Sequence, residues 1–161
     1  MAPYRIILAD KNTPLRLGIR RILAEQADLE IFGEAWDGLN LLSLLKSAAA
    51  GPLMVILDLS LVNLQGPEGI RMIKAMHPDA KVLILSMHED VEYLSLALST
   101  GAEGYLMIEH VDKELLGAIE TIKEGKVYVS PMLAGTIPAG TGAESPELST
   151  HVPQKWQRED A

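Results

Sequence analysis

Short apolar runs alternate with longer segments of helical period along the first 125 residues of the chain. Most of the runs are continuously apolar rather than alternating with polar residues, which is typical of strands buried on both faces of a parallel sheet. The pattern therefore predicts five strands. They are "IILA" at 6–9, "LEIFGEA" at 29–35, "LMVIL" at 53–57, "VLIL" at 82–85 and "GYLM" at 104–107.

The segments between these strands predict five helices. The first follows Thr13-Pro14, which supplies a cap and a first-turn proline, and Arg16 lies off its apolar stripe. That stripe consists of Leu15, Ile19, Ile22 and Leu23. The other four helices are predicted after a cap at Asp37, over 68–77, after a cap at Asp90, and from about Asp112 to Glu124.

Five alternations of strand and helix predict one α/β domain over residues 1–130. Parallel neighbours require right-handed crossovers, which place helices on both faces of a single sheet. We expect a doubly wound parallel (βα)5 sheet with strand order 2-1-3-4-5, followed by "GKVYVSP" (125–131) as a short extended tail. Residues 131–161 hold four of the nine prolines and lack an apolar period, which predicts a linker or flexible tail.

Charge and composition narrow the classes of function. The net charge is -8, whereas a chain that grips nucleic acid through its phosphates needs a basic stripe, so no direct nucleic-acid contact is expected. The absence of Cys excludes disulfides and zinc–thiolate sites and fits a reducing compartment. Because no apolar run approaches membrane-spanning length, we expect a cytoplasmic location without membrane contact.

A polar residue lies at the carboxyl end of three of the predicted strands. Asp10 follows the first strand, Asp58 the third and Ser86 the fourth. In an open parallel sheet, sites form at the carboxyl ends of the strands, where the direction of winding reverses. The first and third strands are neighbours at that point, so Asp10 and Asp58 are predicted to share a cleft, with Ser86 on its rim.

Several kinds of enzyme or nucleotide site fit this edge poorly. A dinucleotide or P-loop site needs glycines after the first strand, and "ADKNTP" (9–14) has none. A haloacid-dehalogenase-like phosphatase needs Asp-x-Asp, whereas "DLS" (58–60) puts Ser60 in the place of the second acid. Hydrolase elbows and HExxH helices are absent. We therefore expect no enzymatic activity.

Six segments within residues 4–131 carry a family resemblance. They are "YRIILAD", "LEIFGEAWDG", "VILDLSL", "HPDAKVLILSMHED", "STGAEGYL" and "EGKVYVSP". In this order they resemble the receiver domain of a two-component response regulator. They are similar to the receivers usually joined to a LuxR-type, or NarL/FixJ-type, helix-turn-helix output domain. The resemblance implies a flavodoxin-like, CheY-like fold.

The resemblance also implies a chemistry that can be assigned residue by residue. Asp58 of "ILDLS" matches the aspartate that accepts a phosphoryl group from a histidine kinase. Mg²⁺ in this family is bound by residues that match Asp58, Asp10 and the carbonyl of Ser60. Ser86 matches the hydroxyl that hydrogen-bonds the phosphoryl oxygen, and Tyr105 matches the aromatic residue that turns inward when that hydroxyl moves.

Two positions depart from the family pattern. Lys11 replaces the second acid after the first strand, usually the direct metal ligand, and Ile108 replaces the lysine that pairs with the phosphoryl group. A lysine lowers the negative charge of the metal pocket, so we expect weak Mg²⁺ binding and slow or absent phosphorylation. Alternatively, Lys11 points to solvent, and Mg²⁺ still binds weakly through Asp10, Asp58 and Ser60.

Two functions remain open at this point. One is a receiver controlled by phosphorylation that regulates transcription through an output domain. We expect that output domain to lie outside this chain, because residues 131–161 are too few and too poor in apolar period to form a helix-turn-helix. The other is a degenerate receiver-like module that responds to a partner or ligand instead of phosphate. In either case, the fourth helix, fifth strand and fifth helix offer a face for an output domain or a homodimer, to which Tyr93, Leu96 and Ile108 contribute apolar area.

Overall fold

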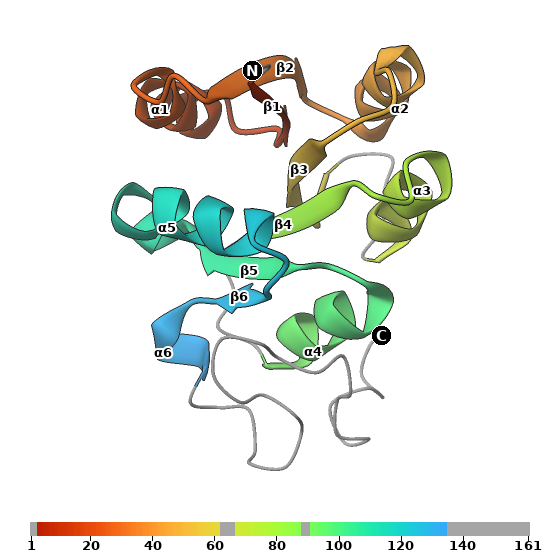
Figure 1. Ribbon diagram of the computed structural model, residues 1–161. Helices are drawn as coiled ribbons and strands as arrows, with labels where there is room; N and C mark the ends of the chain where they lie inside the picture. The colour runs from red at the N-terminus through yellow and green to blue at the C-terminus, as the bar shows by residue number, and fades with distance from the viewer. Residues whose placement is uncertain (1–2, 62–66, 88–90, 135–161) are drawn as a thin grey trace. The chain divides into compact units, whose positions relative to one another are not determined.

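A computed structural model of the chain describes residues 3–61, 67–87 and 91–134, and it arranges the strands in one sheet (Figure 1). The strand order is β2-β1-β3-β4-β5-β6. The predicted order 2-1-3-4-5 is therefore confirmed, with a sixth strand added beside β5. The chain divides into two compact units, of which the first ends at Val82 and the second begins at Leu83.

The helices and strands follow the predicted alternation. They are β1 (Tyr4–Ala9), α1 (Thr13–Ala24), β2 (Leu29–Ala35), α2 (Gly38–Ser47), β3 (Leu53–Asp58), α3 (Glu68–Met76), β4 (Lys81–Ser86), α4 (Val91–Thr100), β5 (Gly104–Met107), the short 3-10 helix η1 (Ile108–His110), α5 (Val111–Lys123), β6 (Tyr128–Val129) and α6 (Pro131–Ala134). Over the described parts of the chain, none of these helices combines the length and apolarity needed to cross a bilayer.

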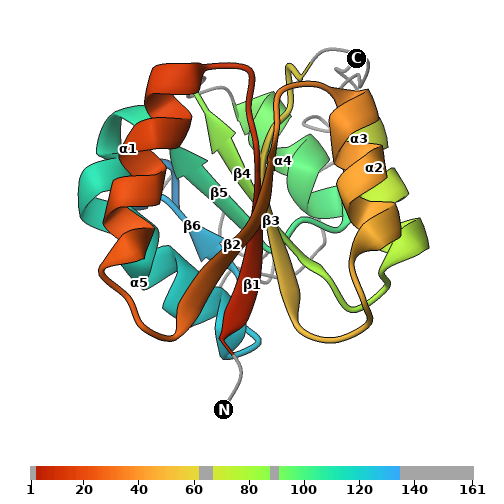
Figure 2. The same ribbon diagram turned by 90° about the horizontal axis from the view of Figure 1, so that it is seen from above.

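In the first unit, β1 is the central strand. It pairs in parallel with β2 on one side and with β3 on the other. Helix α1 covers one face of these strands, while α2 and α3 cover the other (Figure 2). Strand β1 is consequently buried on both faces, and Ile6, Ile7 and Leu8 are at most 1% exposed. This burial is the physical reason for the continuous apolar runs in the sequence.

The ends of the helices in the first unit show one correction to the sequence analysis. The cap of α1 is Asn12 rather than Thr13, because the Asn12 side chain accepts a hydrogen bond from the Leu15 N–H (2.9 Å). Asp37 caps α2 as predicted. The predicted cap of α4, Asp90, lies outside the described residues.

In the second unit, β5 lies between β4 and β6, and both pairings are parallel. Helices α5 and α4 lie on opposite faces of these strands (Figure 2). The tail predicted at 125–131 contributes β6, because the Tyr128 N–H bonds the Glu103 carbonyl (3.0 Å) and the Ser130 N–H bonds the Tyr105 carbonyl (2.9 Å). The sheet therefore has one strand more than the sequence predicts.

A cluster of hydrogen bonds around Glu114 attaches this added strand to α5 and β5. The hydroxyls of Tyr128 and Ser130 each donate to Glu114 Oε1 at 3.0 Å, and the N–H of Met107 donates to Ser130 Oγ at 3.0 Å. Burial, together with the bond to Glu114, raises the pKa of Tyr128 above its ordinary range. Packing continues beyond this cluster into the predicted linker, since Leu133 of α6 is buried.

Replacing Gly104 by Ala should destabilise the protein by about 1–3 kcal/mol, the usual cost of overpacking a filled core. A Cβ at Gly104 would lie 2.7 Å from Cδ1 of Ile122 and 2.7 Å from Cδ1 of Leu83, and both side chains are buried. Urea unfolding measures the change. Gly117 in α5 is the matched control, because a Cβ there meets no atom within 4 Å. Since Ala favours a helix interior by about 0.5–1 kcal/mol over Gly, Gly117→Ala should stabilise; changes of the same sign in both variants would contradict this packing.

Candidate functional site

Asp10 and Asp58 occupy matching positions at the carboxyl ends of two neighbouring strands. Ala9 of β1 pairs with Leu57 of β3. Asp10 directly follows Ala9, and Asp58 directly follows Leu57 as the last residue of β3. Asp10 is only 4% exposed, and Asp58 is half-buried. The first unit therefore brings together the two carboxylates that the sequence predicts to share a site.

The Asp10 carboxylate is buried with only one of its oxygens hydrogen-bonded. Oδ1 accepts the N–H of Asn12 (2.8 Å), whereas Oδ2 is buried and has no hydrogen-bond partner among the described residues. Burial raises the pKa of the Asp10 carboxyl, and the nearby charge of Asp58 raises it further. The Asn12 hydrogen bond and the charges of Arg16 and Lys11 act in the opposite direction and lower that pKa.

Asp58 is held by the residue two positions after it. The N–H of Ser60 lies 3.0 Å from Asp58 Oδ1, and the Ser60 hydroxyl lies 2.9 Å from Oδ1 and 3.0 Å from Oδ2. A hydroxyl has a single proton to donate, so it serves one carboxylate oxygen at a time. The sequence analysis considered only the Ser60 carbonyl. The side-chain contact could have been found from the tendency of Asp and Ser to form local turns after a strand.

Lys11 lies on the surface beside this pair. Its side chain is exposed, and it forms no ion pair with any described residue. Its charge is also the smallest of the influences on the pKa of Asp10. In this arrangement, Lys11 leaves the buried Asp10 oxygen without a compensating contact.

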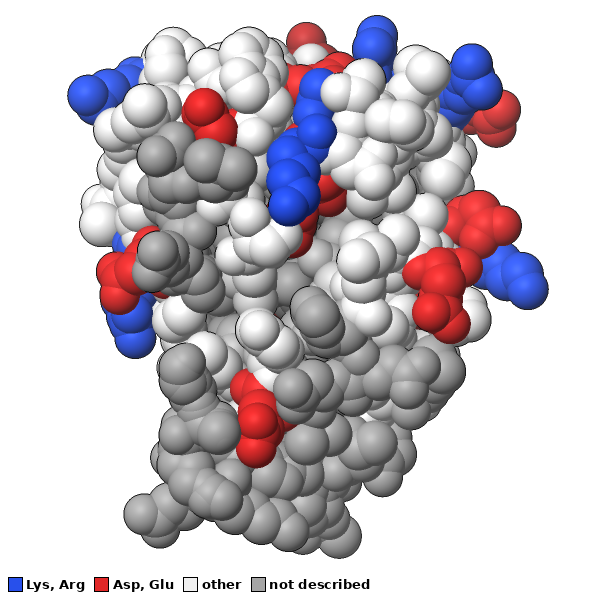
Figure 3. Space-filling model, turned by 180° about the vertical axis from the view of Figure 1, so that it is seen from behind, with Lys and Arg blue, Asp and Glu red and all other residues white. Residues whose placement is uncertain are grey.

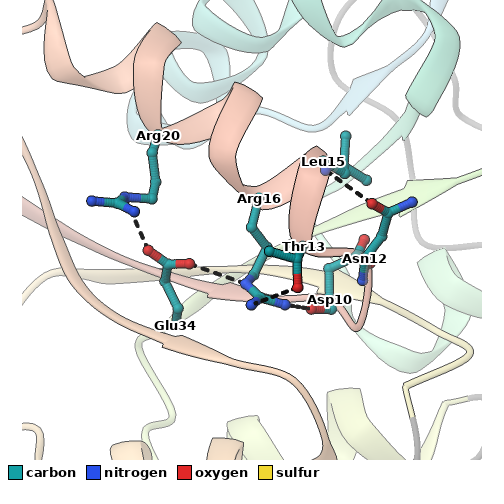
Figure 4. Close-up of polar contacts among 7 residues, drawn as sticks. All are labelled: Asp10, Asn12, Thr13, Leu15, Arg16, Arg20 and Glu34. Carbon is teal, nitrogen blue, oxygen red and sulfur yellow. Dashed lines mark hydrogen bonds and ion pairs between the residues drawn. The ribbon is translucent and has the colours of Figure 1, made fainter.

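Arg16 and Glu34 form an ion pair next to Asp10 that the sequence analysis missed (Figure 4). Arg16 Nε lies 3.0 Å from Glu34 Oε1, and the Arg16 side chain is only 11% exposed. Another nitrogen of the same guanidinium, Nη1, donates to the backbone carbonyl of Asp10. Arg20 contacts the second oxygen of Glu34 at 3.1 Å. Because Arg16 lies off the apolar stripe of α1, helical periodicity alone predicts an exposed side chain.

Ser86, Tyr105 and Ile108 belong to the second unit. Ser86 ends β4 opposite Met107, and Tyr105 lies fully buried in β5 opposite Ile84. Ile108 begins η1 and is half-buried. Ser86 and Tyr105 therefore lie on neighbouring strands, as the predicted strand order requires.

The oxygen atoms offered by Asp10, Asp58 and Ser60 fit a hard divalent cation such as Mg²⁺. They comprise two carboxylates and a main-chain carbonyl, and Mg²⁺ prefers oxygen ligands. The buried Asp10 Oδ2 is a polar atom whose missing partner a cation would replace. Among the described residues, no group of three or more His, Cys, Asp or Glu side chains is placed so that it could hold a metal ion. A cation held here would therefore keep several of its water ligands.

Figure 3 shows how charge is distributed over one face of the molecule. Among the side chains described there, Lys and Arg are scattered, and uncharged or acidic side chains separate them. The overall charge of the chain is -8. The described part of this face therefore shows no continuous basic stripe.

Comparison with known proteins gives a consistent result. Residues 6–120 match the family model of the response regulator receiver domain. Over 130 residues the chain is 32% identical to the response regulator GacA of Pseudomonas protegens, and the alignment covers 81% of this chain and 60% of GacA. The chain spans little more than half the length of such curated relatives.

Solved structures show the same likeness. A LuxR-family two-component response regulator from Aurantimonas sp. superimposes with a TM-score of 0.76 at 30% identity, covering 83% of this chain and 94% of that one. The non-phosphorylated receiver domain of the stress response regulator RcsB from Escherichia coli gives a TM-score of 0.73 at 25% identity, covering 79% and 98%. These similarities bear out the fold expected from the sequence.

Replacing Asp10 by Asn should stabilise the protein near neutral pH, with a gain that disappears in acid. Because the folded-state pKa of Asp10 is raised, its contribution to stability is fully present below the unfolded-state pKa and is lost as the pH rises through the folded value. The Asn side chain avoids this loss, so the difference in unfolding free energy should grow from about pH 4 upward. Urea unfolding from pH 4 to pH 8 in EDTA measures it. Asp79→Asn, at an exposed position, is the control; a difference for Asp10→Asn that does not change with pH would contradict this account.

Proposed function

Since the chain belongs to the response regulator receiver domain family, we propose that its Asp58 accepts a phosphoryl group from a histidine kinase. One observation carries this proposal: Asp58 lies at a strand end that matches the position of Asp10, whose buried carboxylate oxygen lacks a hydrogen-bond partner among the described residues. Domains of this family are signalling domains, and a phosphoacceptor role needs no catalytic acid of the phosphatase kind.

Asp58 supplies the nucleophile in this proposal. A carboxylate oxygen of Asp58 forms a bond to phosphorus, while the bond from phosphorus to the histidine nitrogen of the kinase breaks and the nitrogen keeps the bonding electrons. The N–H and hydroxyl of Ser60 hold the carboxylate in place. When the hydroxyl donates to Oδ1, which also accepts the Ser60 N–H, Oδ2 remains available for attack.

The cation proposed for this site is Mg²⁺, held by Asp10, Asp58 and the carbonyl of Ser60. When bound, it would neutralise negative charge on the transferring phosphoryl oxygens. Lys11 leaves the pocket with one carboxylate fewer than the family pattern, and Ile108 leaves the end of β5 without the phosphoryl-pairing lysine. We therefore expect weak Mg²⁺ binding and slow phosphorylation.

Ser86 and Tyr105 are the proposed switch residues. They lie on the neighbouring strands β4 and β5, and both are buried. Movement of the Ser86 hydroxyl toward a phosphoryl oxygen would change the packing around Tyr105. Such a change would reach the face formed by α4, β5 and α5, where Tyr93 is 39% exposed and Leu96 is partly exposed. We propose this face for pairing with an output domain or a second copy.

The proposed setting is transcription control in the cytoplasm. We assign residues 1–130 to the receiver and residues 131–161 to a linker or flexible tail. Curated relatives such as GacA extend beyond the part that this chain matches, and we propose that the receiver acts through a DNA-binding output domain. In that arrangement, the receiver itself makes no contact with nucleic acid or membrane.

A second candidate is a receiver-like interaction module that does not depend on phosphate. Lys11 and Ile108 favour it, because both replace groups that the family uses to bind the cation and the phosphoryl group. Asp58, Ser86 and Tyr105 favour the first candidate, because a module without phosphorylation has no need for them. The two candidates differ in a measurable property, the occupancy of Asp58 by phosphate.

Incubation with Mg²⁺ and acetyl phosphate should add one phosphoryl group per chain, slowly, as measured by intact mass spectrometry over time. Asp58→Asn should abolish the added mass, because an amide is a much weaker nucleophile than a carboxylate. Rapid stoichiometric phosphorylation would contradict the weakened site. If no phosphate is added by small donors or by histidine kinases, the phosphate-independent module is the function.

Combining Lys11→Asp with Ile108→Lys should raise Mg²⁺ affinity and the rate of phosphorylation, each by about tenfold or more. Exchanging an ammonium for a carboxylate near the cation changes the local charge by two units, and tenfold corresponds to only about 1.4 kcal/mol. Calorimetric titration with Mg²⁺ measures the affinity. Lys46→Asp makes the same charge change as Lys11→Asp alone, but in α2, before β3 and thus away from the strand end that carries Asp58. An equal gain in that control, or no gain in the double variant, would show that Lys11 and Ile108 do not weaken the site.

A further inference from the structure

The guanidinium of Arg16 joins three parts of the first unit (Figure 4). It contacts Glu34 of β2 (3.0 Å), the backbone carbonyl of Asp10 after β1, and the Thr13 hydroxyl at the start of α1 (3.4 Å). The side chain reaches these partners while only 11% exposed. Arg16 thus spans the turn that leads from β1 into α1.

The same turn determines where the Asp10 carboxylate lies. The Asp10 N–H bonds the Ala35 carbonyl of β2 (2.9 Å), and Asp10 Oδ1 accepts the Asn12 N–H (2.8 Å). The Asn12 side chain in turn caps α1 through the Leu15 N–H (2.9 Å). The Arg16 contact fixes the Asp10 carbonyl, which none of these other bonds constrains. Together they restrain the backbone on both sides of the Asp10 side chain.

We propose that Arg16, braced by Glu34, is a positioning residue that holds the Asp10 carboxylate in place for a cation beside Asp58. The proposal rests on the cation site put forward above. Arg16 acts through the backbone of Asp10, because its contact is with the Asp10 carbonyl and not with the carboxylate oxygens. Glu34 orients the guanidinium from β2, so the position of Asp10 is tied to both strands.

The Arg16–Glu34 pair is partly buried, with side chains 11% and 25% exposed, and the energetics of ion pairs removed from water support a geometric role for Arg16. Removing a guanidinium from water is costly, and a buried pair often contributes less to stability than apolar residues of similar size. The planar guanidinium is suited to several acceptors at fixed angles, which a lysine cannot match. An arginine with three acceptors at this turn therefore fixes the path of the chain more than it adds to the stability of the fold.

Loss of Arg16 would have two opposite effects on cation binding. The positive charge near Asp10 disfavours a cation, so electrostatics alone predicts tighter Mg²⁺ binding when Arg16 is removed. Loss of positioning predicts weaker binding, because residues that orient metal ligands commonly contribute 10–100-fold to affinity. The direction of the change therefore separates the two roles.

Arg20 is a matched control for this test. It contacts Oε2 of the same Glu34 at 3.1 Å, but its side chain is 54% exposed and no dashed line joins it to Asp10 in Figure 4. Replacing Arg20 removes the same charge from the same helix. The positioning contact to Asp10 remains intact in that variant.

Mg²⁺ titration of the full chain should show about tenfold weaker binding for Arg16→Met than for the unchanged protein. Arg20→Met should bind Mg²⁺ within about twofold of the unchanged protein, since exposed charges have small effects. Arg16→Lys should restore only part of the affinity, because an ammonium cannot occupy the fork of the guanidinium. Equal or tighter Mg²⁺ binding by Arg16→Met would overturn the proposal.

Amide hydrogen exchange without metal tests the positioning role independently of the proposed function. In Arg16→Met, the protection of the Asn12 N–H, which bonds the Asp10 carboxylate, should fall about fivefold or more. Protection of Ile6 and Ile7 in β1 should be unchanged, and Arg20→Met should leave the Asn12 amide unaffected. A uniform loss of protection across β1, or none at Asn12, would overturn the proposal. If the unchanged protein binds no Mg²⁺ and takes up no phosphate, the proposed function fails, while this exchange experiment still decides the role of Arg16.

Discussion

Strands β1 and β3 are covered on both faces by helices of the first unit, and their central side chains are almost completely buried. Such strands can place polar side chains near water only where they end. Since the two strands are parallel neighbours in register, their carboxyl ends bring Asp10 and Asp58 to matching positions. The burial that stabilises the core therefore also concentrates the candidate chemistry at one edge of the sheet.

This arrangement leaves the Asp10 carboxylate in an unfavourable environment. A buried polar atom without a hydrogen bond costs about 1–3 kcal/mol, and Asp10 Oδ2 is in that situation among the described residues. The surrounding turn does not relieve it, because the nearby donors are directed to Oδ1 and to the backbone carbonyl. Local departures of this kind are expected where a site is prepared for a ligand. The unpaired oxygen therefore lowers the stability of the fold, and a cation bound to it would restore that stability.

The sequence predicts much of this structure and part of the site. Continuous apolar runs and helical periods were sufficient for five strands, five helices and the strand order, because burial imposes both patterns. These patterns did not predict β6, because its two residues pair through backbone atoms. They also did not identify Asn12 as the cap of α1, because the neighbouring Thr13 is an equally suitable cap residue. The ion pair of Arg16 with Glu34 joins residues 18 positions apart, and periodicity carries no information about such a pair. Asp10 and Asp58 were predictable because strand ends follow directly from the apolar pattern.

The hydrogen bonds around Glu114 have a consequence for where the folded receiver ends. The Ser130 hydroxyl bonds both the Glu114 carboxylate and the Met107 N–H. A fragment ending with α5 at Lys123 would thus lose the partners of a half-buried carboxylate and of a buried backbone N–H at the end of β5. Such a fragment would contain every predicted site residue and still lack part of the second unit. The boundary of the folded receiver must therefore lie beyond Ser130 and not at the end of its last long helix, which gives a criterion for dividing longer relatives into domains.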